Sequence, residues 1–163
     1  MSAPTHYSRP QIILHWIVVL LVAFNLSLSD GMEAMFRASQ KGTDLSANDA
    51  LLGNLHIYAG IAVLIFALAR LYLRLAKGVP AAPKGPRLQE LAGSLVHWGI
   101  YALIFLIPMS GMVAWFGGVE LAGEGHGLLQ NVLLILVILH VAAALYHQFV
   151  VKDNLLARMW RSH

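Results

Sequence analysis

Residues 126–140 read HGLLQNVLLILVILH, an apolar run with a histidine at each end. No Asp, Glu, Lys or Arg occurs between Gly127 and Val151. About 20 apolar residues are enough for an α-helix to cross the ~30 Å hydrocarbon core of a membrane. A segment inside lipid must satisfy its own backbone hydrogen bonds, which a helix does. The sequence therefore predicts a membrane-spanning helix over residues 127–151.

Three similar blocks precede this one, at residues 11–29, 51–73 and 91–116, and only Arg70 interrupts them. The chain has 163 residues, of which 58% are hydrophobic and 12% charged, whereas soluble domains carry about 25% charged residues. Alternating strands of about 10 residues, which mark membrane barrels, are absent. We therefore expect a single domain over residues 1–163, an all-α integral membrane protein with four transmembrane helices in an up-down-up-down bundle. So little polar surface argues against nucleic-acid binding.

Positive charges predict the orientation of the chain, because Lys and Arg concentrate in cytoplasmic connections. Nine of the eleven lie on the side of the two termini, and only Arg37 and Lys41 lie on the other. Both termini are therefore expected in the cytoplasm of a bacterium, with the chain crossing its inner membrane. The opposite, periplasmic side is rich in Asp and Glu.

Histidines are the most informative polar residues. Six of the eight lie in or beside the apolar blocks: His15, His56, His97, His126, His140 and His147. An ionisable residue inside a span is costly, usually faces the bundle interior, and is a functional candidate. A single histidine often only bridges two helices, but six are too many for that role alone.

Spacing along the fourth block suggests two sites at different depths. His126 and His140 are 14 residues apart, which places both imidazoles near one helix face with a rise of about 21 Å. Two flat cofactors stacked across the membrane need this arrangement, with His56 as the second ligand at the outer level and His15 at the inner level. By depth alone, His147 competes with His140 as the partner of His15.

Haem is the metal centre that these residues favour. The chain has no cysteine, which excludes iron–sulfur clusters, thiolate-bound zinc and thioether-linked haem. Zinc needs three or four ligands at one level, and proton relays usually include a carboxylate within the spans. Haem iron accepts neutral imidazole as an axial ligand and needs no thiolate.

The chain resembles the bacterial cytochrome b561 family, which is similar to the cytochrome b subunits of nickel–iron hydrogenases and formate dehydrogenases. The resemblance covers nearly the whole chain. It rests on the following ordered motifs: Tyr7-Ser8-Arg9, Leu14-His15-Trp16, Leu55-His56 with Gly60, the Arg70–Arg74 run, His97 with Tyr101 and Pro108, His126 fourteen residues before His140, and the tail from Ala142 through His147 and Lys152 to Met159.

This resemblance implies two b-type haems. It assigns the inner haem to His15 and His140, ahead of His147, and the outer haem to His56 and His126. His97 and His147 match family positions that do not bind iron. The first interpretation of both is hydrogen bonding around the haem, and the alternative is a quinone site.

Three interpretations of charged residues stay open. Arg70 and Arg74, with Arg87, either pair with inner haem propionates or only anchor the chain at the headgroups. Arg37 and Lys41 either steer a small anion toward the outer haem or are merely solvated.

Two stacked haems would carry electrons between the periplasmic side and ubiquinone in the bilayer. Proteins similar to this one act as superoxide oxidases, so superoxide is an expected electron donor. One alternative is a cytochrome b subunit serving a periplasmic dehydrogenase or hydrogenase. A different class of function, a haem or metal transporter, also remains open.

Overall fold

The computed structural model describes residues 4, 6–81 and 86–160. Its helices are α1 (Arg9–Ser27), α2 (Ser29–Lys41), α3 (Ala47–Lys77), α4 (Arg87–Gly117) and α5 (Glu120–Tyr146). A π-helical turn (His147–Val151) continues α5, and a 3₁₀ turn (Leu155–Met159) follows. Four helices are long and apolar enough to cross a membrane: α1, α3, α4 and α5 with its π turn. The predicted all-α bundle of four membrane helices is therefore confirmed.

Helix ends follow local chemistry. The backbone N–H of Ser8 donates to the side chain of Gln11 at 2.9 Å ahead of α1, and Ser46 accepts from the backbone N–H of Asp49 at 3.1 Å ahead of α3. Both contacts satisfy donors that a helix start leaves free. At 31 residues each, α3 and α4 extend for about 46 Å at 1.5 Å per residue. Each is longer than its predicted apolar block, because its ends reach beyond the hydrocarbon core.

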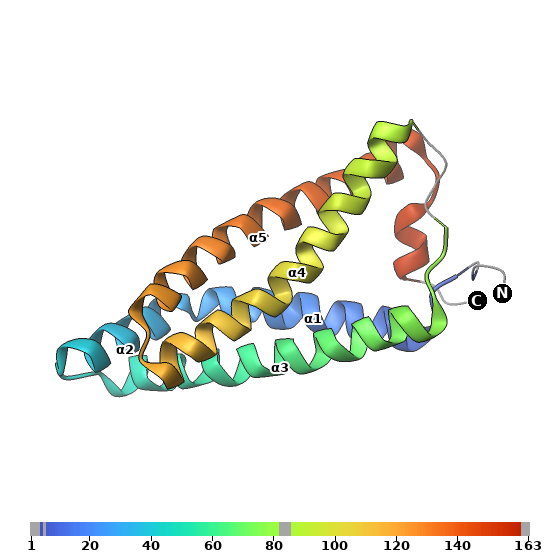
Figure 1. Cartoon of the computed structure of the whole chain (residues 1–163). Helices are drawn as coiled ribbons and strands as arrows, with labels where there is room; N and C mark the ends of the chain where they lie inside the picture. The colour runs from blue at the N-terminus through green and yellow to red at the C-terminus, as the bar shows by residue number, and fades with distance from the viewer. Residues whose placement is uncertain (1–3, 5, 82–85, 161–163) are drawn as a thin grey trace.

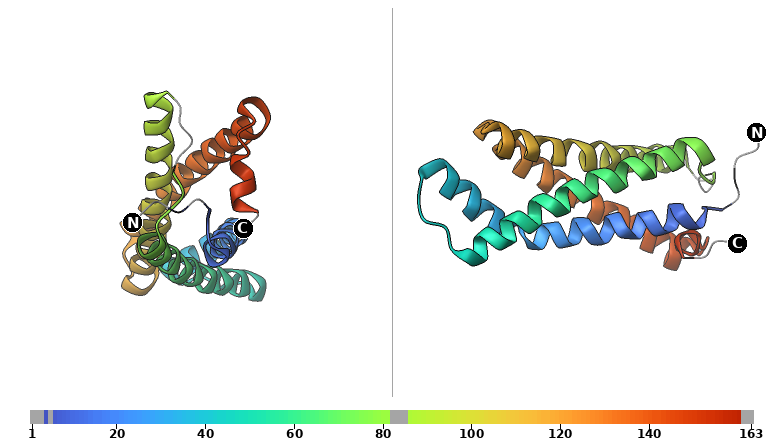
Figure 2. Two further views of the ribbon diagram at one scale, coloured as in Figure 1. Left: turned by 90° about the vertical axis from the view of Figure 1, so that its right-hand side faces the viewer. Right: turned by 90° about the horizontal axis from the view of Figure 1, so that it is seen from below.

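The helices form a wedge (Figures 1 and 2). α1 packs along α3, α4 packs along α5, and the two pairs diverge toward the end that holds both chain termini. We call this end the terminal end and the opposite one the α2 end. Inside the wedge, Ala67 of α3 is fully buried and packs with Leu103, Ile104 and Leu133 of α4 and α5. These small and branched side chains set the spacing of the helices between the two ends.

α2 was not expected, because the sequence suggested only a loop after the first span. It is an amphipathic helix whose Gly31, Met35 and Ala38 are buried, and it packs on the start of α3. Its C-terminal cap, Gly42, takes a left-handed conformation with φ of 63°, which glycine adopts without steric cost. α2 therefore closes one end of the bundle over the helices below it.

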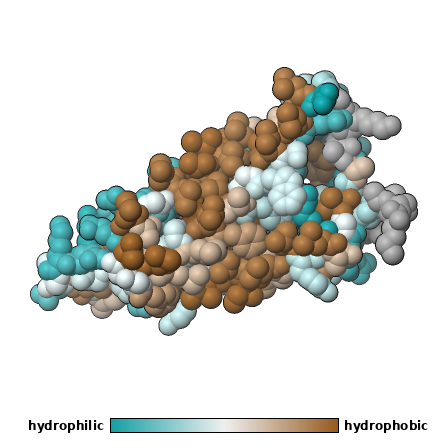
Figure 3. All heavy atoms as spheres, in the orientation of Figure 1, coloured by the Kyte–Doolittle hydropathy of each residue, from teal (hydrophilic) through white to brown (hydrophobic). Residues whose placement is uncertain are grey.

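Apolar side chains cover much of the face of the bundle that Figure 3 shows. Brown surface extends over the middle of the molecule, and teal surface gathers at the α2 end. Leu134, Ile135 and Ile138 of α5 are among the exposed large side chains. Because lipid tails are as apolar as these residues, this surface suits a membrane.

The terminal end is tied together by the segment after α5. Trp16 of α1 donates from its indole N–H to the carbonyl of Met159 at 3.0 Å, and its ring lies 4.8 Å from the ring of Trp160. Arg158 donates to the carbonyl of Ala81 at 2.9 Å, in the proline-rich connector whose residues 82–85 lie outside the described part. The C-terminal segment therefore crosses the wide end of the wedge.

Candidate functional site

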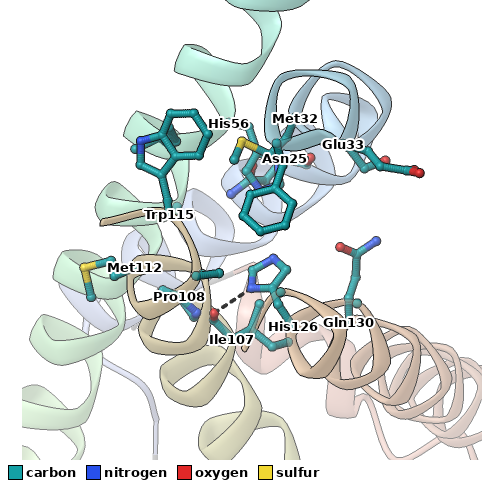
Figure 4. Close-up of a pocket in the computed structure, with 18 of the residues that line it drawn as sticks. Asn25, Met32, Glu33, His56, Ile107, Pro108, Met112, Trp115, His126 and Gln130 are labelled. Carbon is teal, nitrogen blue, oxygen red and sulfur yellow. Dashed lines mark hydrogen bonds between the residues drawn. The ribbon is translucent and has the colours of Figure 1, made fainter. Parts of the chain in front are cut away.

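The first histidine pair lies near the α2 end. His56 of α3 and His126 of α5 have ring centroids 6.1 Å apart. Both line a cavity of about 620 Å³, to which α1, α2, α3, α4 and α5 all contribute, mostly with apolar side chains. Figure 4 shows this cavity, with His126 of α5 near Ile107 and Pro108 of α4. Its volume falls within the range of roughly 300–1,000 Å³ typical of cofactor and small-molecule sites.

Both imidazoles of this pair are fixed through Nδ1. His126 donates from Nδ1 to the backbone carbonyl of Ile107 at 2.8 Å (Figure 4). His56 lies with Nδ1 3.2 Å from the carbonyl of Asn25. A carbonyl only accepts hydrogen bonds, so Nδ1 of His126 carries the ring proton and Nε2 keeps its lone pair. This is the usual state of a metal-ligating histidine.

A glycine makes the contact of His126 possible. A Cβ atom at Gly111 would lie 3.0 Å from the His126 ring, closer than ordinary packing allows. The missing side chain lets the imidazole reach the carbonyl of Ile107 one turn earlier on α4. Across the cavity, the side-chain amide of Asn25 satisfies its hydrogen bonds when its nitrogen points at His56. In this orientation the nitrogen donates to Nδ1 of His56 at 2.7 Å.

The distance between the two rings fits one shared metal atom. Imidazole nitrogen binds a metal at about 2 Å and lies roughly 1 Å from its ring centre, so two rings on opposite sides of one iron have centroids about 6 Å apart. The observed 6.1 Å agrees with this value. The residues at the α2 end therefore fit a haem with two histidine ligands.

Carboxylates surround the cavity at the α2 end. Asp30, Glu33, Glu120 and Glu124 all line it, and no Lys or Arg is among its lining residues. Arg37, for which the sequence left open either anion steering or simple solvation, lies 3.5 Å from Glu33 in an exposed ion pair. Neither Arg37 nor Lys41 lines the cavity. The electrostatic field at this opening is therefore that of an acidic surface.

The second group of histidines lies toward the terminal end. His15 of α1 and His140 of α5 have ring centroids 6.5 Å apart, close to the spacing expected for two ligands of one iron. His97 of α4 lies nearer still to His140, at 5.1 Å. The structure therefore brings together three of the histidines that the sequence singled out at this depth.

His15 differs from the other candidate ligands in its Nδ1 partner. Arg70 of α3 donates from its guanidinium to Nδ1 of His15 at 2.6 Å. An arginine only donates hydrogen bonds, so Nδ1 accepts and the ring proton lies on Nε2. A neutral imidazole in this state has no lone pair on Nε2. The His15–His140 pair thus fits iron in spacing, and Arg70 must release Nδ1 before Nε2 becomes a ligand.

Two arginines form a cationic cluster beside His15. The guanidinium of Arg74 lies 5.1 Å from the ring centre of Trp98 and 5.5 Å from that of Tyr101, and Arg70 lies 5.8 Å from the Tyr101 ring. Within the described ranges, neither arginine forms an ion pair with a carboxylate. Burial raises the pKa of the nearby Tyr7 hydroxyl, although Arg74 acts against this. The cluster therefore presents two positive charges and a neutral phenol to an anionic group.

His147 lies apart from both pairs and has polar partners of its own. It donates from Nδ1 to the carboxylate of Asp153 at 2.6 Å, and the side-chain amide of Gln89 donates to its Nε2 at 2.9 Å. The sequence had suggested His147 as a competitor for iron, and both of its ring nitrogens are engaged elsewhere. Asp153, Gln89, Asn25 and the carbonyl of Ile107 were not predicted as site groups.

Known proteins similar to this chain give the site its context. Residues 6–162 match a family model described as prokaryotic cytochrome b561. A cytochrome b562 of Cereibacter sphaeroides is 37% identical over 162 residues, covering 99% of each chain. A probable superoxide oxidase CybB of Yersinia pestis is 30% identical, covering 94% of each chain. The cytochrome b561 homolog 1 of Escherichia coli is 29% identical, covering 94% of this chain and 96% of its own.

Proposed function

This chain belongs to the prokaryotic cytochrome b561 family, and on that premise we propose that it carries electrons between the periplasmic side of the bacterial inner membrane and quinone in the bilayer. One observation carries the proposal: two histidine pairs, with ring centroids 6.1 and 6.5 Å apart, lie at two depths of one bundle. The two ligands on α5 are 14 residues apart, which separates the levels by about 21 Å.

His56 with His126, and His15 with His140, would hold two haem b groups. Bound haem would supply one-electron redox chemistry. The protein's part is to hold the imidazoles at the spacing that one iron requires and to surround them with apolar side chains. His97, whose ring lies 5.1 Å from that of His140, is the proposed neighbour that orients this ligand.

Arg70 has a proposed second partner. To hold iron through Nε2, His15 would need its ring proton on Nδ1, which could then not accept from Arg70. Arg70 and Arg74 would then hold the carboxylates of the haem at the terminal end. Charge-assisted bonds to a carboxylate are stronger than one to a neutral imidazole, which favours the exchange.

The distribution of Lys and Arg supports a cytoplasmic terminal end and a periplasmic α2 end. Superoxide, which gives one electron and becomes O₂, is the proposed donor at the α2 end by likeness to the probable superoxide oxidase of Yersinia pestis. Ubiquinone is the proposed acceptor.

The test uses purified full-length protein in liposomes that contain decyl-ubiquinone. The reduced-minus-oxidised spectrum and a haem assay should give two haem b per chain, and superoxide generated outside should reduce the quinone unless superoxide dismutase is added. One haem or none, or haem that is lost reversibly without quinone reduction, would refute the proposal in favour of a transporter.

A second donor is favoured by the four carboxylates that line the opening at the α2 end: Asp30, Glu33, Glu120 and Glu124. Negative surfaces slow the approach of an anion and speed that of a cation. A periplasmic redox protein with a basic surface is therefore the alternative to superoxide. Its transfer rate should fall as salt is added, whereas the rate with superoxide should rise.

A further inference from the structure

Asn25 of α1 presents two opposite groups to one nitrogen of His56. Its backbone carbonyl lies 3.2 Å from Nδ1, and the nitrogen of its side-chain amide donates to the same atom at 2.7 Å. The carbonyl can pair only with a proton on Nδ1, whereas the amide N–H can pair only with a lone pair there. Since Nδ1 cannot meet both demands, Asn25 decides which ring nitrogen of His56 carries the proton.

The surroundings of the Asn25 amide favour the orientation that donates to the ring. In it, the amide nitrogen also lies 3.2 Å from the carbonyl of His56, and the amide oxygen accepts from the backbone N–H of Gly60 at 3.1 Å. Turning the amide over would set two donors and two acceptors against each other. The backbone carbonyl of Asn25 already accepts from the N–H of Leu28 at 3.1 Å, so it does not need the ring proton.

Gly60 lets the Asn25 amide come this close to α3. A Cβ atom at Gly60 would lie 3.4 Å from the amide, so a bulkier side chain there would displace it. Asn25, His56 and Gly60 all line the cavity at the α2 end. Burying an amide is costly unless its hydrogen bonds are made. Here the N–H groups and the oxygen of Asn25 find their partners on α3, which fixes the amide against the His56 ring.

The same arrangement recurs at the other level of the α1–α3 pair. Arg70 of α3 donates to Nδ1 of His15 on α1 at 2.6 Å. Each of these two helices thus places a donor on the histidine of the other. On α5, His126 is in the opposite state, because the carbonyl of Ile107 accepts from its Nδ1 at 2.8 Å. The α1–α3 pair therefore holds its imidazoles away from the tautomer that binds metal, whereas His126 is already in it.

We infer that Asn25 is a positioning residue that holds His56 in the tautomer that cannot bind iron, so that haem must compete with the Asn25 amide for this ring. The inference rests on the proposed function. With the amide donating to Nδ1, the ring proton of His56 lies on Nε2. To hold iron, His56 gives this proton to water, takes one up at Nδ1 and shares the lone pair of Nε2 with the metal, so the ring stays neutral. Nδ1 then donates to the backbone carbonyl of Asn25.

The decisive variant is Asn25→Leu, which keeps the size of the side chain and the backbone carbonyl but removes the donor. Nδ1 of His56 is then left with the carbonyl at 3.2 Å, so the ring proton moves to Nδ1 and Nε2 becomes free for iron. Leucine suits a membrane helix, so α1 is preserved. Asn54→Leu is the matched control, because Asn54 lies on the helix of His56 and donates to the carbonyl of Ala50 on that same helix at 2.7 Å.

The experiment measures how tightly the full-length protein holds the haem at the α2 end, by equilibrium competition with apomyoglobin. The absorption band that is missing from His56→Ala identifies this haem. Asn25→Leu should hold it about 2 to 10 times more tightly than the wild type, the range that one hydrogen bond supplies. Asn54→Leu should match the wild type.

Asn25→Asp gives a second readout, which a role in packing alone would not move. A carboxylate only accepts hydrogen bonds, so it would bond to the Nδ1–H of His56 and make the imidazole a more basic ligand. The reduction potential of the haem at the α2 end should therefore fall relative to Asn54→Asp, which adds the same charge to α3 away from the ring.

Looser binding in Asn25→Leu would show that Asn25 supports the iron ligand, and it would overturn the inference. Unchanged binding in Asn25→Leu, or a potential in Asn25→Asp equal to that of Asn54→Asp, would overturn it as well. If the wild type itself has no low-spin haem that depends on His56, the proposed function fails instead. The two failures are therefore distinguishable.

Discussion

Gly111 is the position where one added methyl group best tests the site at the α2 end. In Gly111→Ala, the new Cβ would lie 3.0 Å from both Cε1 and Nδ1 of His126. The ring must move by several tenths of an ångström to restore normal contact, and its hydrogen bond of 2.8 Å to the carbonyl of Ile107 then lengthens. We expect the haem at this end to bind more weakly.

The size of the effect follows from the contact that is lost. Removing a group that orients a metal ligand typically costs about 10–100-fold in affinity, or about 1.4–2.7 kcal/mol at room temperature. Alanine is the better helix former by about 1 kcal/mol, so the substitution does not weaken α4 itself. Gly93→Ala, on the same helix, is the matched control. An added Cβ at Gly93 would have no neighbouring side chain or other helix within 4 Å.

The assay is haem content per chain with the low-spin spectrum, measured during washing with apomyoglobin as a haem acceptor. Gly111→Ala should lose one haem about 10–100 times faster than the wild type, and Gly93→Ala should keep both. Equal retention in the two variants would show that the contact between His126 and Ile107 does not position an iron ligand.

Three further predictions concern other parts of the site. His56→Ala should remove one haem and spare the second, and a full complement of two low-spin haems would refute its role as a ligand. His147→Ala should keep both haems, since both of its ring nitrogens have other partners; loss of one would show that it binds iron in place of His140. Glu120→Gln combined with Glu124→Gln should raise the rate with superoxide at least about twofold at low salt, and an unchanged rate would exclude steering by the opening.

The membrane helices could be predicted because their signal is local. Each apolar block has about the 20 residues that cross the hydrocarbon core, or more, and charge interrupts only one of them. α2 escaped prediction because its apolar residues, including Met35, are few and lie among charged ones. Its helix is stabilised by packing on α3 rather than by lipid. A surface helix of this kind carries an amphipathic pattern, which was the available signal.

The proximity of His56 to His126 could be predicted from depth along the helices, since rise per residue is constant. For His15, depth alone left His140 and His147 as alternatives, and only the family resemblance favoured His140. Their partners could not. Asn25 and the carbonyl of Ile107 contact the imidazoles only after four helices have packed, and a backbone carbonyl has no signature in the sequence. The contact between Arg70 and His15 joins residues 55 positions apart. It depends on the crossing of α1 and α3.

The two ends of the bundle differ in a way that bears on the direction of electron flow. At the α2 end, His126 donates to the carbonyl of Ile107, and the four carboxylates that line the cavity would favour loss of an electron from an iron held there by stabilising its more positive state. At the terminal end, Arg70 and Arg74 favour the less positive, reduced state. Opposite charges in a medium of low dielectric constant act more strongly than in water. The charge pattern therefore supports the proposed direction of electron transfer, from the α2 end toward the terminal end.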